Sequence, residues 1–184
     1  MIRGEHHSRS YAAATGKGEV MKMLLGRAEG NPDKPDNSGQ TPLSYAAGNG
    51  KGEVVKMLLE GQEVNIENPH DLERTPLSYA AAYRDREAVI TLLGREEVNP
   101  DKPDNKGRTP LSYAARAWHR DGADRHVGVV KMLLEGQEVN PDKSDNEGRT
   151  PLSHSTGQGM LNITGDHCPP NYTFFVAFLF FSSC

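Results

Sequence analysis

The body of this 184-residue chain lacks cysteine, and its first residues lack the apolar run that a secretory leader would show. Its two cysteines, Cys168 and Cys184, lie in the last stretch, so no disulfide can hold the preceding residues together. The first seven residues contain no apolar run of the kind that a secretory signal requires. We therefore expect an intracellular protein, in the cytoplasm or the nucleus.

Charge of one sign is not concentrated anywhere in the chain. The net charge is −4 at pH 7 and the two signs are interspersed, so no basic face indicates nucleic acid and no acidic block indicates a charged tail. Apolar residues are also few, at 35%, whereas 19 Gly and 12 Pro are enough to separate many short elements. This composition favours an array of small repeats over a single large core.

A tetrad, Thr-Pro-Leu-Ser, recurs at intervals of 34, 34 and 41 residues. A Leu-Leu pair, and an asparagine seven residues after its first leucine, recur in the same register. Because spacing, order and residue type all agree, the chain is built from internal repeats. The tetrads begin at Thr41, Thr75, Thr109 and Thr150, the leucine pairs begin at Leu24, Leu58, Leu92 and Leu133, and the asparagines are Asn31, Asn65, Asn99 and Asn140.

Each repeat predicts two antiparallel helices. Thr41 is a favourable N-cap, and Pro42 suits the first helical position because its missing N–H would have no partner there. The small apolar stripe that follows ends in the glycine-rich run 48–52, and the segment 53–59 has apolar residues at helical spacing up to Gly61. No unit can bury its stripe alone, so neighbouring units must stack. The sequence therefore predicts an all-α repeat solenoid.

The consensus of these units resembles the ankyrin repeat: Gly-x-Thr-Pro-Leu-x-x-Ala-Ala, a short loop, Val-Val-x-x-Leu-Leu and Val-Asn. The resemblance covers roughly residues 10 to 154, and the repeats are similar to near-identical arrays from filamentous fungi. It implies stacked helix-turn-helix units with turn or hairpin fingers, and a role in protein–protein interaction. We expect a partial repeat at 1–36, repeats at 37–70 and 71–104, a repeat at 105–145 with an insertion at about 116–125, a partial repeat at 146–155 and an apolar, disordered tail at 156–184.

Three departures from the family's pattern affect the fingers and loops. The histidine that usually follows Thr-Pro-Leu is serine in all four tetrads, which predicts weaker bonding between repeats. Glu73 stands where the other turns have Gly39, Gly107 and Gly148. A non-glycine residue in a left-handed conformation costs about 1 kcal/mol, so we expect this turn to be distorted or built differently. The insertion offers an additional binding feature.

Partners of this family usually contact the finger tips and the loop side of the first helix, which implies a candidate surface in this chain. Arg74, Arg108 and Arg149 share one repeat position and predict a row of guanidinium groups able to grip carboxylates, with a solvated edge as the plainer interpretation. Tyr83 and Trp118 are the expected hot spots because aromatic residues dominate binding energy. The candidate residues are Gln40, Leu72, Arg74, Tyr83, Lys106, Arg108, Arg116, Trp118, Glu147 and Arg149.

The sequence contains no motif for catalysis or for cofactor binding. Gly-Lys-Gly, at 16–18 and 50–52, lacks the following Ser or Thr and the preceding strand of a phosphate loop. No metal-ligand spacing and no nucleophile motif occurs, so we expect no cofactor, no metal, no small-molecule substrate and no enzymatic activity. The apolar segment 173–181 is shorter than the roughly 20 residues of a membrane-spanning helix, so we expect no membrane span.

Three interpretations stay open at this point. In the first, the chain is a monomeric module that binds another protein and no nucleic acid. In the second, it is a regulatory or sensor fragment of a larger fungal multidomain nucleotide-binding or hydrolase protein whose chemistry lies outside this chain. In the third, it is a truncated remnant without function. Tyr45, Tyr79 and Tyr113, which recur inside the first helix, are expected to pack in each case.

Overall fold

A computed structural model describes residues 3–26, 31–61, 64–67, 72–83, 85–116, 123–135 and 139–155. The candidate residue Trp118, most of the insertion at about 116–125 and the tail 156–184 lie outside the described residues. Every element of the described part is a helix.

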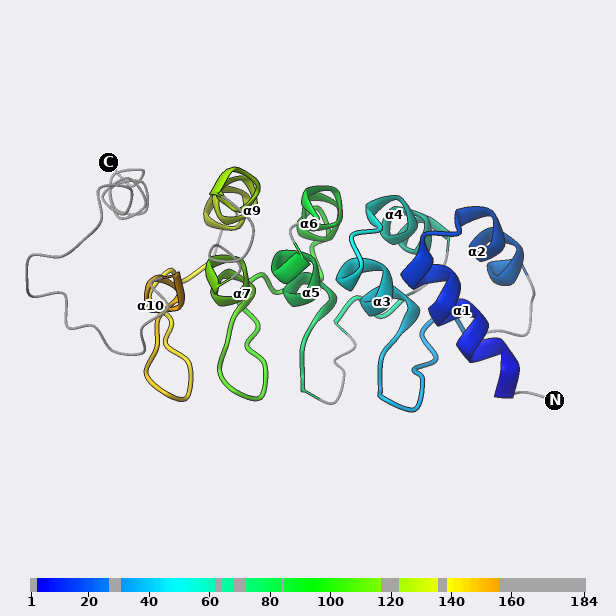
Figure 1. The fold of residues 1–184 in the computed structure, drawn as a ribbon, viewed down its shortest axis with the longest axis horizontal. Coiled ribbons are helices and arrows are strands. Elements are labelled where there is room, and N and C mark those ends of the chain that lie inside the picture. The colour runs from blue at the N-terminus through cyan, green and yellow to red at the C-terminus, as the bar shows by residue number, and fades with distance from the viewer. Residues whose placement is uncertain are drawn as a thin grey trace, which may run out of the picture.

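The helices form two rows, with the first helix of each unit in one row and the second helix in the other (Figure 1). This part of the chain is therefore an all-α repeat solenoid, as the sequence predicts. The first row holds α1 (Arg3–Thr15), α3 (Pro42–Gly48), α5 (Pro76–Tyr83), α7 (Pro110–Arg116) and α10 (Pro151–Ser155). The second row holds α2 (Gly18–Leu25), α4 (Gly52–Gly61), α6 (Arg86–Leu93) and α9 (Ala123–Glu135).

The first-row helices α3, α5 and α7 begin at the predicted threonine caps. Thr41 Oγ1 accepts a hydrogen bond from the Ser44 N–H at 3.2 Å, and Pro42 occupies the first turn. The equivalent bonds cap α5 and α7, also at 3.2 Å. In these three units the serine hydroxyl also lies 3.2 or 3.3 Å from the hydroxyl of the capping threonine. The serine that replaces the family's histidine thus supports the start of its own helix. Hydrogen bonds between units are made by other residues.

The core lies between the two rows and continues along the stack. Ala46 and Ala47 in α3 are fully buried, and these small side chains let the neighbouring first-row helices approach closely. The second row covers them with branched side chains, such as Val55 and Leu58 in α4. The same positions are buried in the following units, at Ala80, Ala81, Val89 and Leu92, and at Ala114, Ala115, Val130 and Leu133. Each unit therefore covers the apolar stripe of its neighbour, as stacking requires.

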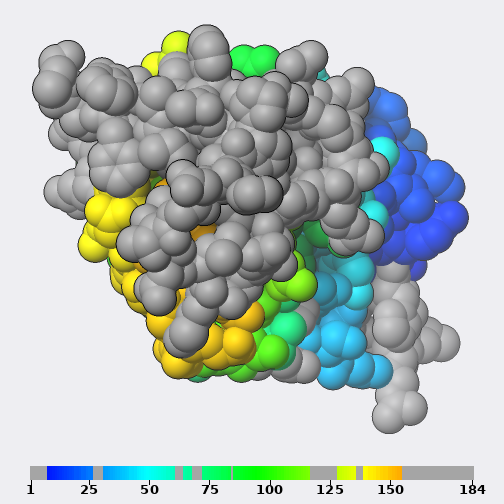
Figure 2. All heavy atoms as spheres, turned by 60° about the vertical axis from the view of Figure 1, so that its left-hand side comes forward, coloured from blue at the N-terminus to red at the C-terminus, as the bar shows by residue number. Residues whose placement is uncertain are grey.

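We call the ten-residue loop before each first-row helix a finger. Backbone hydrogen bonds join the last three fingers, from the Asn105 N–H to the Leu72 carbonyl at 3.1 Å and from the Asn146 N–H to the Lys106 carbonyl at 2.9 Å. The Asn65 N–H of the second finger donates to Asp33 Oδ2 of the first at 2.7 Å. The fingers lie side by side below the first row in Figure 1, and Figure 2 shows orange, green, cyan and blue segments following one another across the surface. They form one continuous edge. The fingers are 31–40, 65–74, 99–108 and 140–149, and residues 68–71 of the second lie outside the described part.

Glu73 adopts the backbone conformation of the glycines that it replaces. Its φ is 57°, against 73°, 78° and 76° for Gly39, Gly107 and Gly148. It is the one non-glycine residue with positive φ in the described part of the chain. The expectation of a differently built turn is therefore wrong at this residue, because the finger imposes the left-handed conformation, whose cost for an L-residue is about 1 kcal/mol.

Part of the insertion is helical. The sequence aligns Lys131 with Lys56, so the start of α4 at Gly52 corresponds to residue 127, yet α9 begins at Ala123. As a result α9 has 13 residues and α4 has 10. The expectation that the insertion lies between the two helices is therefore wrong for its last residues, which lengthen the second helix of that unit.

Candidate functional site

Three repeat positions bring polar side chains together where each finger meets its helix. They are the residue five before the capping threonine, the residue just before it, and the residue four after it. We call them the finger-base residues. In the described part of the chain they are Asp36, Gln40 and Tyr45, then Arg74 and Tyr79, then Asp104, Arg108 and Tyr113, and last Asp145, Arg149 and His154.

The finger base before α7 is a closed polar network. Arg108 Nη2 and Nε donate to Asp104 Oδ2 at 2.7 and 3.0 Å, and the Tyr113 hydroxyl donates to the same oxygen at 2.6 Å. Asp104 Oδ1 accepts from the backbone N–H groups of Lys106 and Arg108, both at 2.9 Å. The Arg108 Cζ lies 5.0 Å from the centroid of the Tyr113 ring, and both Asp104 and Arg108 are buried. The Arg108 guanidinium is thus hydrogen-bonded and paired in charge within its own finger.

The electrostatics of this network favour the ionised carboxylate. Burial by itself raises the pKa of Asp104, but hydrogen bonds from Arg108, from the Tyr113 hydroxyl and from the finger N–H groups outweigh it, so the pKa lies below its ordinary value. Burial and the hydrogen bond to Asp104 raise the pKa of Tyr113. At physiological pH the base therefore contains an ion pair and a neutral tyrosine.

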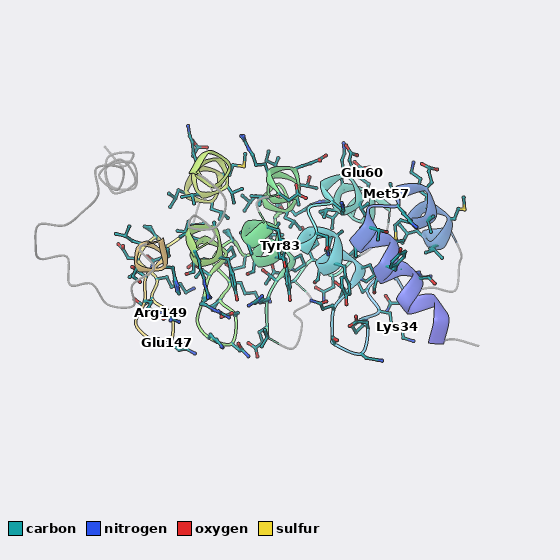
Figure 3. The ribbon with its side chains drawn as sticks, viewed as in Figure 1. Lys34, Met57, Glu60, Tyr83, Glu147 and Arg149 are labelled. Atoms are coloured by element: carbon teal, nitrogen blue, oxygen red, sulfur yellow. The ribbon has the colours of Figure 1, made fainter. Side chains whose placement is uncertain are left out.

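His154 takes the place of the tyrosine in α10. Its Nε2 lies 3.0 Å from Asp145 Oδ2, and Arg149 Nε donates to the same oxygen at 2.9 Å. Arg149 Nη1 also lies 2.8 Å from Glu147 Oε2, and Figure 3 shows these two side chains together on the last finger. Burial lowers the pKa of His154, and the carboxylate of Asp145 only partly opposes that shift. At neutral pH we therefore expect a neutral imidazole whose Nε2–H donates to Asp145.

The finger before α3 carries an amide in place of the guanidinium. Gln40 Nε2 donates to the Tyr79 hydroxyl of the next unit at 3.3 Å. The Tyr45 hydroxyl donates to Asp36 Oδ2 at 2.6 Å, and this bond together with burial raises the pKa of Tyr45 to about 12. The Gln40 side chain is therefore bonded to the neighbouring unit of this chain and is not a free contact for a partner protein.

Arg74 differs from the other two arginines because its finger has no aspartate at the equivalent position. The sequence has His70 there, which lies outside the described residues. The Arg74 Cζ lies 5.7 Å from the centroid of the Tyr79 ring and 4.6 Å from that of the Tyr113 ring. Its Nε is buried without a hydrogen-bond acceptor in the described part of the chain. Burial raises the pKa of Tyr79, and hydrogen bonds from Gln40 and Arg74 oppose that rise.

The prediction that Arg74, Arg108 and Arg149 form a row of guanidinium groups available to a partner requires correction. Arg108 and Arg149 are neutralised by Asp104 and Asp145, because the tight finger turn brings a carboxylate back beside the arginine four residues later. Among the described residues, only Arg74 of the three has no carboxylate partner. The sequence holds a signal for this pairing, since aspartate stands five residues before three of the four capping threonines.

The remaining candidates lie on the finger edge or at the loop ends of the first row. Tyr83 ends α5 and is 60% exposed, and Figure 3 shows it in the first row of helices. Leu72 is a finger residue with 36% of its surface exposed. Lys106 and Glu147 are exposed finger residues, and Arg116 is exposed at the end of α7. Three of these five residues belong to fingers, and the other two are the last residues of first-row helices.

The recurring tyrosines pack against preceding units, as the sequence predicts for two of them. Tyr79 and Tyr113 are buried, and a Cβ added at Gly48 would lie 3.2 Å from Tyr79 Cδ1. Tyr45 is partly exposed, but it also packs against the core. Tyr11, which occupies the same repeat position in α1, is 60% exposed, since no described unit covers it. The sequence interpretation missed this exposed ring, although the alignment of Tyr11 with Tyr45 would have indicated it.

No group of three or more His, Cys, Asp or Glu side chains in the described ranges is placed to hold a metal ion. The helices that the structure describes include none long and apolar enough to cross a membrane.

The sequence profile of the family described as ankyrin repeats (3 copies) matches residues 9–68 and 60–140. The search of curated proteins found no match.

Proposed function

Because the chain belongs to the ankyrin-repeat family, we propose that it binds another protein along its finger edge and the loop ends of its first-row helices. Ankyrin repeats generally mediate protein–protein interaction, and such domains are typically non-enzymatic binding modules. The side chains proposed to contact the partner are Leu72, Tyr83, Lys106, Arg116 and Glu147.

The exposure of Tyr83 carries the proposal. A tyrosine offers a large apolar ring with a polar end and loses little rotamer freedom on binding, so it suits the centre of an interface. At 60% exposed, the Tyr83 ring is available at the end of α5. Leu72 adds apolar surface on the adjoining finger, and the exposed charges of Lys106 and Glu147 suit a polar rim.

The proposal can be tested with the full chain and a library of random peptides displayed on phage. We expect selected peptides to bind the wild-type chain and to bind Tyr83→Ala about 10-fold more weakly, the loss typical of a central aromatic contact. Affinity is measured with synthetic peptides by isothermal titration calorimetry.

Ile90→Ala is the matched control. Ile90 is similarly exposed, at 57%, but lies on α6 in the second row, away from the finger edge. We expect this variant to bind as the wild type does. Peptides that lose affinity for Ile90→Ala and keep it for Tyr83→Ala would place binding on the opposite side, and a library that yields no binder would also contradict the proposal.

A further inference from the structure

We propose that Arg74 is an anchor for a carboxylate of the partner, so that the segment bound by this surface is acidic. The inference rests on the proposed protein-binding function and names the chemistry that the surface selects. It follows from a comparison of the finger bases within this one chain.

The other arginines of the row show what this repeat position does when an aspartate is present. Arg108 donates two hydrogen bonds to Asp104 Oδ2, and Arg149 Nε donates to Asp145 Oδ2 at 2.9 Å. Each guanidinium thereby has a carboxylate within its own finger. The position that would supply one for Arg74 is His70 in the sequence. No described carboxylate forms an ion pair with Arg74, so its positive charge is not neutralised within the described part of the protein.

The surroundings of Arg74 strengthen its attraction for an anion. Tyr79 and Tyr113 place their rings 5.7 and 4.6 Å from the Arg74 Cζ, and the side chain is partly buried. A guanidinium carries a permanent positive charge in proteins. Because the local dielectric is lower than in water, a carboxylate that reaches the guanidinium interacts with it more strongly than at an open surface. The two rings pack against the guanidinium, and its Nε is already buried.

Tyr83 places an apolar contact on the same helix face. Tyr79 and Tyr83 are four residues apart in α5, so the exposed ring lies one helical turn from the tyrosine that contacts Arg74. We therefore expect the bound segment to carry an apolar or aromatic residue beside its acidic one.

A carboxylate matches this site better than a phosphate. Among the described residues no carboxylate neutralises the positive charge of Arg74, and the neighbouring Arg108 is already paired with Asp104 at 2.7 Å. A singly charged carboxylate therefore balances the site, whereas a phosphate would bring up to two negative charges. A phosphopeptide preference is accordingly an outcome that would overturn this assignment.

The test uses the full chain with synthetic peptides taken from the phage selection. We expect the selected peptides to share an Asp or Glu, and Arg74→Gln to weaken their binding about 10-fold. Replacing the shared acidic residue of the peptide by its amide should weaken binding by about the same factor. Combining this change with Arg74→Gln should weaken binding little more than either change alone, because both remove the same interaction. Arg149→Gln is the control, since that guanidinium is held by Asp145 and Glu147, and it should bind normally.

A second variant tests the site without removing Arg74. His70→Asp supplies the aspartate found at this position in the other fingers, and it should compete with the peptide and weaken binding about 10-fold without lowering the thermal unfolding midpoint. His70→Asn, which adds no charge, should bind as the wild type does. Unchanged binding by both Arg74→Gln and His70→Asp would overturn the inference, as would tighter binding of a phosphoserine peptide than of the acidic one.

The two proposals fail in different ways. If Tyr83→Ala weakens binding while Arg74→Gln does not, the surface binds protein without the carboxylate anchor, and only this inference is wrong. If neither Tyr83→Ala nor Arg74→Gln changes the affinity of the selected peptides, the proposed binding surface itself is wrong.

Discussion

The Nη2 atom of Arg108 lies 2.7 Å from Oδ2 of Asp104, and the two side chains are 8% and 0% exposed. A charge pair this far from water depends on both partners, because each ion alone would lose its hydration without compensation. The network therefore stabilises the finger before α7 as long as it stays complete.

Asp104→Asn should lower the free energy of unfolding by about 3 kcal/mol, because it leaves the Arg108 charge buried without a carboxylate. Urea unfolding followed by far-UV circular dichroism measures this. Asp145→Asn is the matched control, since Arg149 is 27% exposed and also contacts Glu147, so its charge stays solvated and paired. We expect this control to lose less free energy of unfolding, about 1 kcal/mol. Equal losses in the two variants would contradict this account of the Asp104 network.

Glu73→Gly should raise the free energy of unfolding by about 1 kcal/mol, because glycine adopts the φ of 57° observed at this residue without the clash of a Cβ. Thermal and urea unfolding both report the change. Gly39→Ala places a Cβ at the equivalent residue, where φ is 73°, and should have the opposite sign. A glycine variant that is less stable than the wild type would show that the Glu73 side chain stabilises the finger more than its backbone strain destabilises it.

His154 should make the stability of the chain depend on pH in the weakly acidic range. Burial holds its folded-state pKa below the ordinary value of 6.5, so the unfolded chain takes up a proton at a pH where the folded protein does not. Stability should therefore be complete above about pH 6.5 and fall as the pH drops through that value towards the folded pKa. The charged groups around the ring are Asp145, Arg149 and Arg116, and the lowered pKa of Asp145 places its own titration below this range.

His154→Tyr isolates this contribution with a residue that the chain itself uses. Tyr113 donates to Asp104 from the same repeat position, so a tyrosine in α10 should donate to Asp145 and stay neutral. We expect the variant to lose less stability than the wild type between about pH 7 and about pH 5, as measured by urea unfolding at each pH. Parallel curves for the two proteins would mean that His154 does not titrate differently on folding.

The predictable parts of this protein are those set by local patterns. Thr41 and Pro42 indicate the start of α3 through capping chemistry that involves only the first turn, and the structure confirms the cap. The burial of Ala46 and Ala47 likewise follows from a stripe that the unit cannot cover by itself. The solvent exposure of a side chain was harder to predict, because it depends on which unit packs against it. Tyr11 and Tyr79 share a repeat position, but only Tyr79 has a described unit packed in front of it.

The sequence by itself determined the repeats, the two helices of each unit and the stacking order, since periodicity and helix caps are properties of short segments. Only the tertiary structure decided that Asp104 and Asp145 pair with Arg108 and Arg149, whereas Arg74 has no carboxylate partner among the described residues. Arg74 and Arg108 share one repeat position, yet the folded finger places Asp104 beside Arg108 and leaves Arg74 between two tyrosine rings. The physical reason is that a guanidinium is neutralised by the carboxylate that the chain brings within about 3 Å of it, and that distance exists only once the finger has folded and the units have stacked.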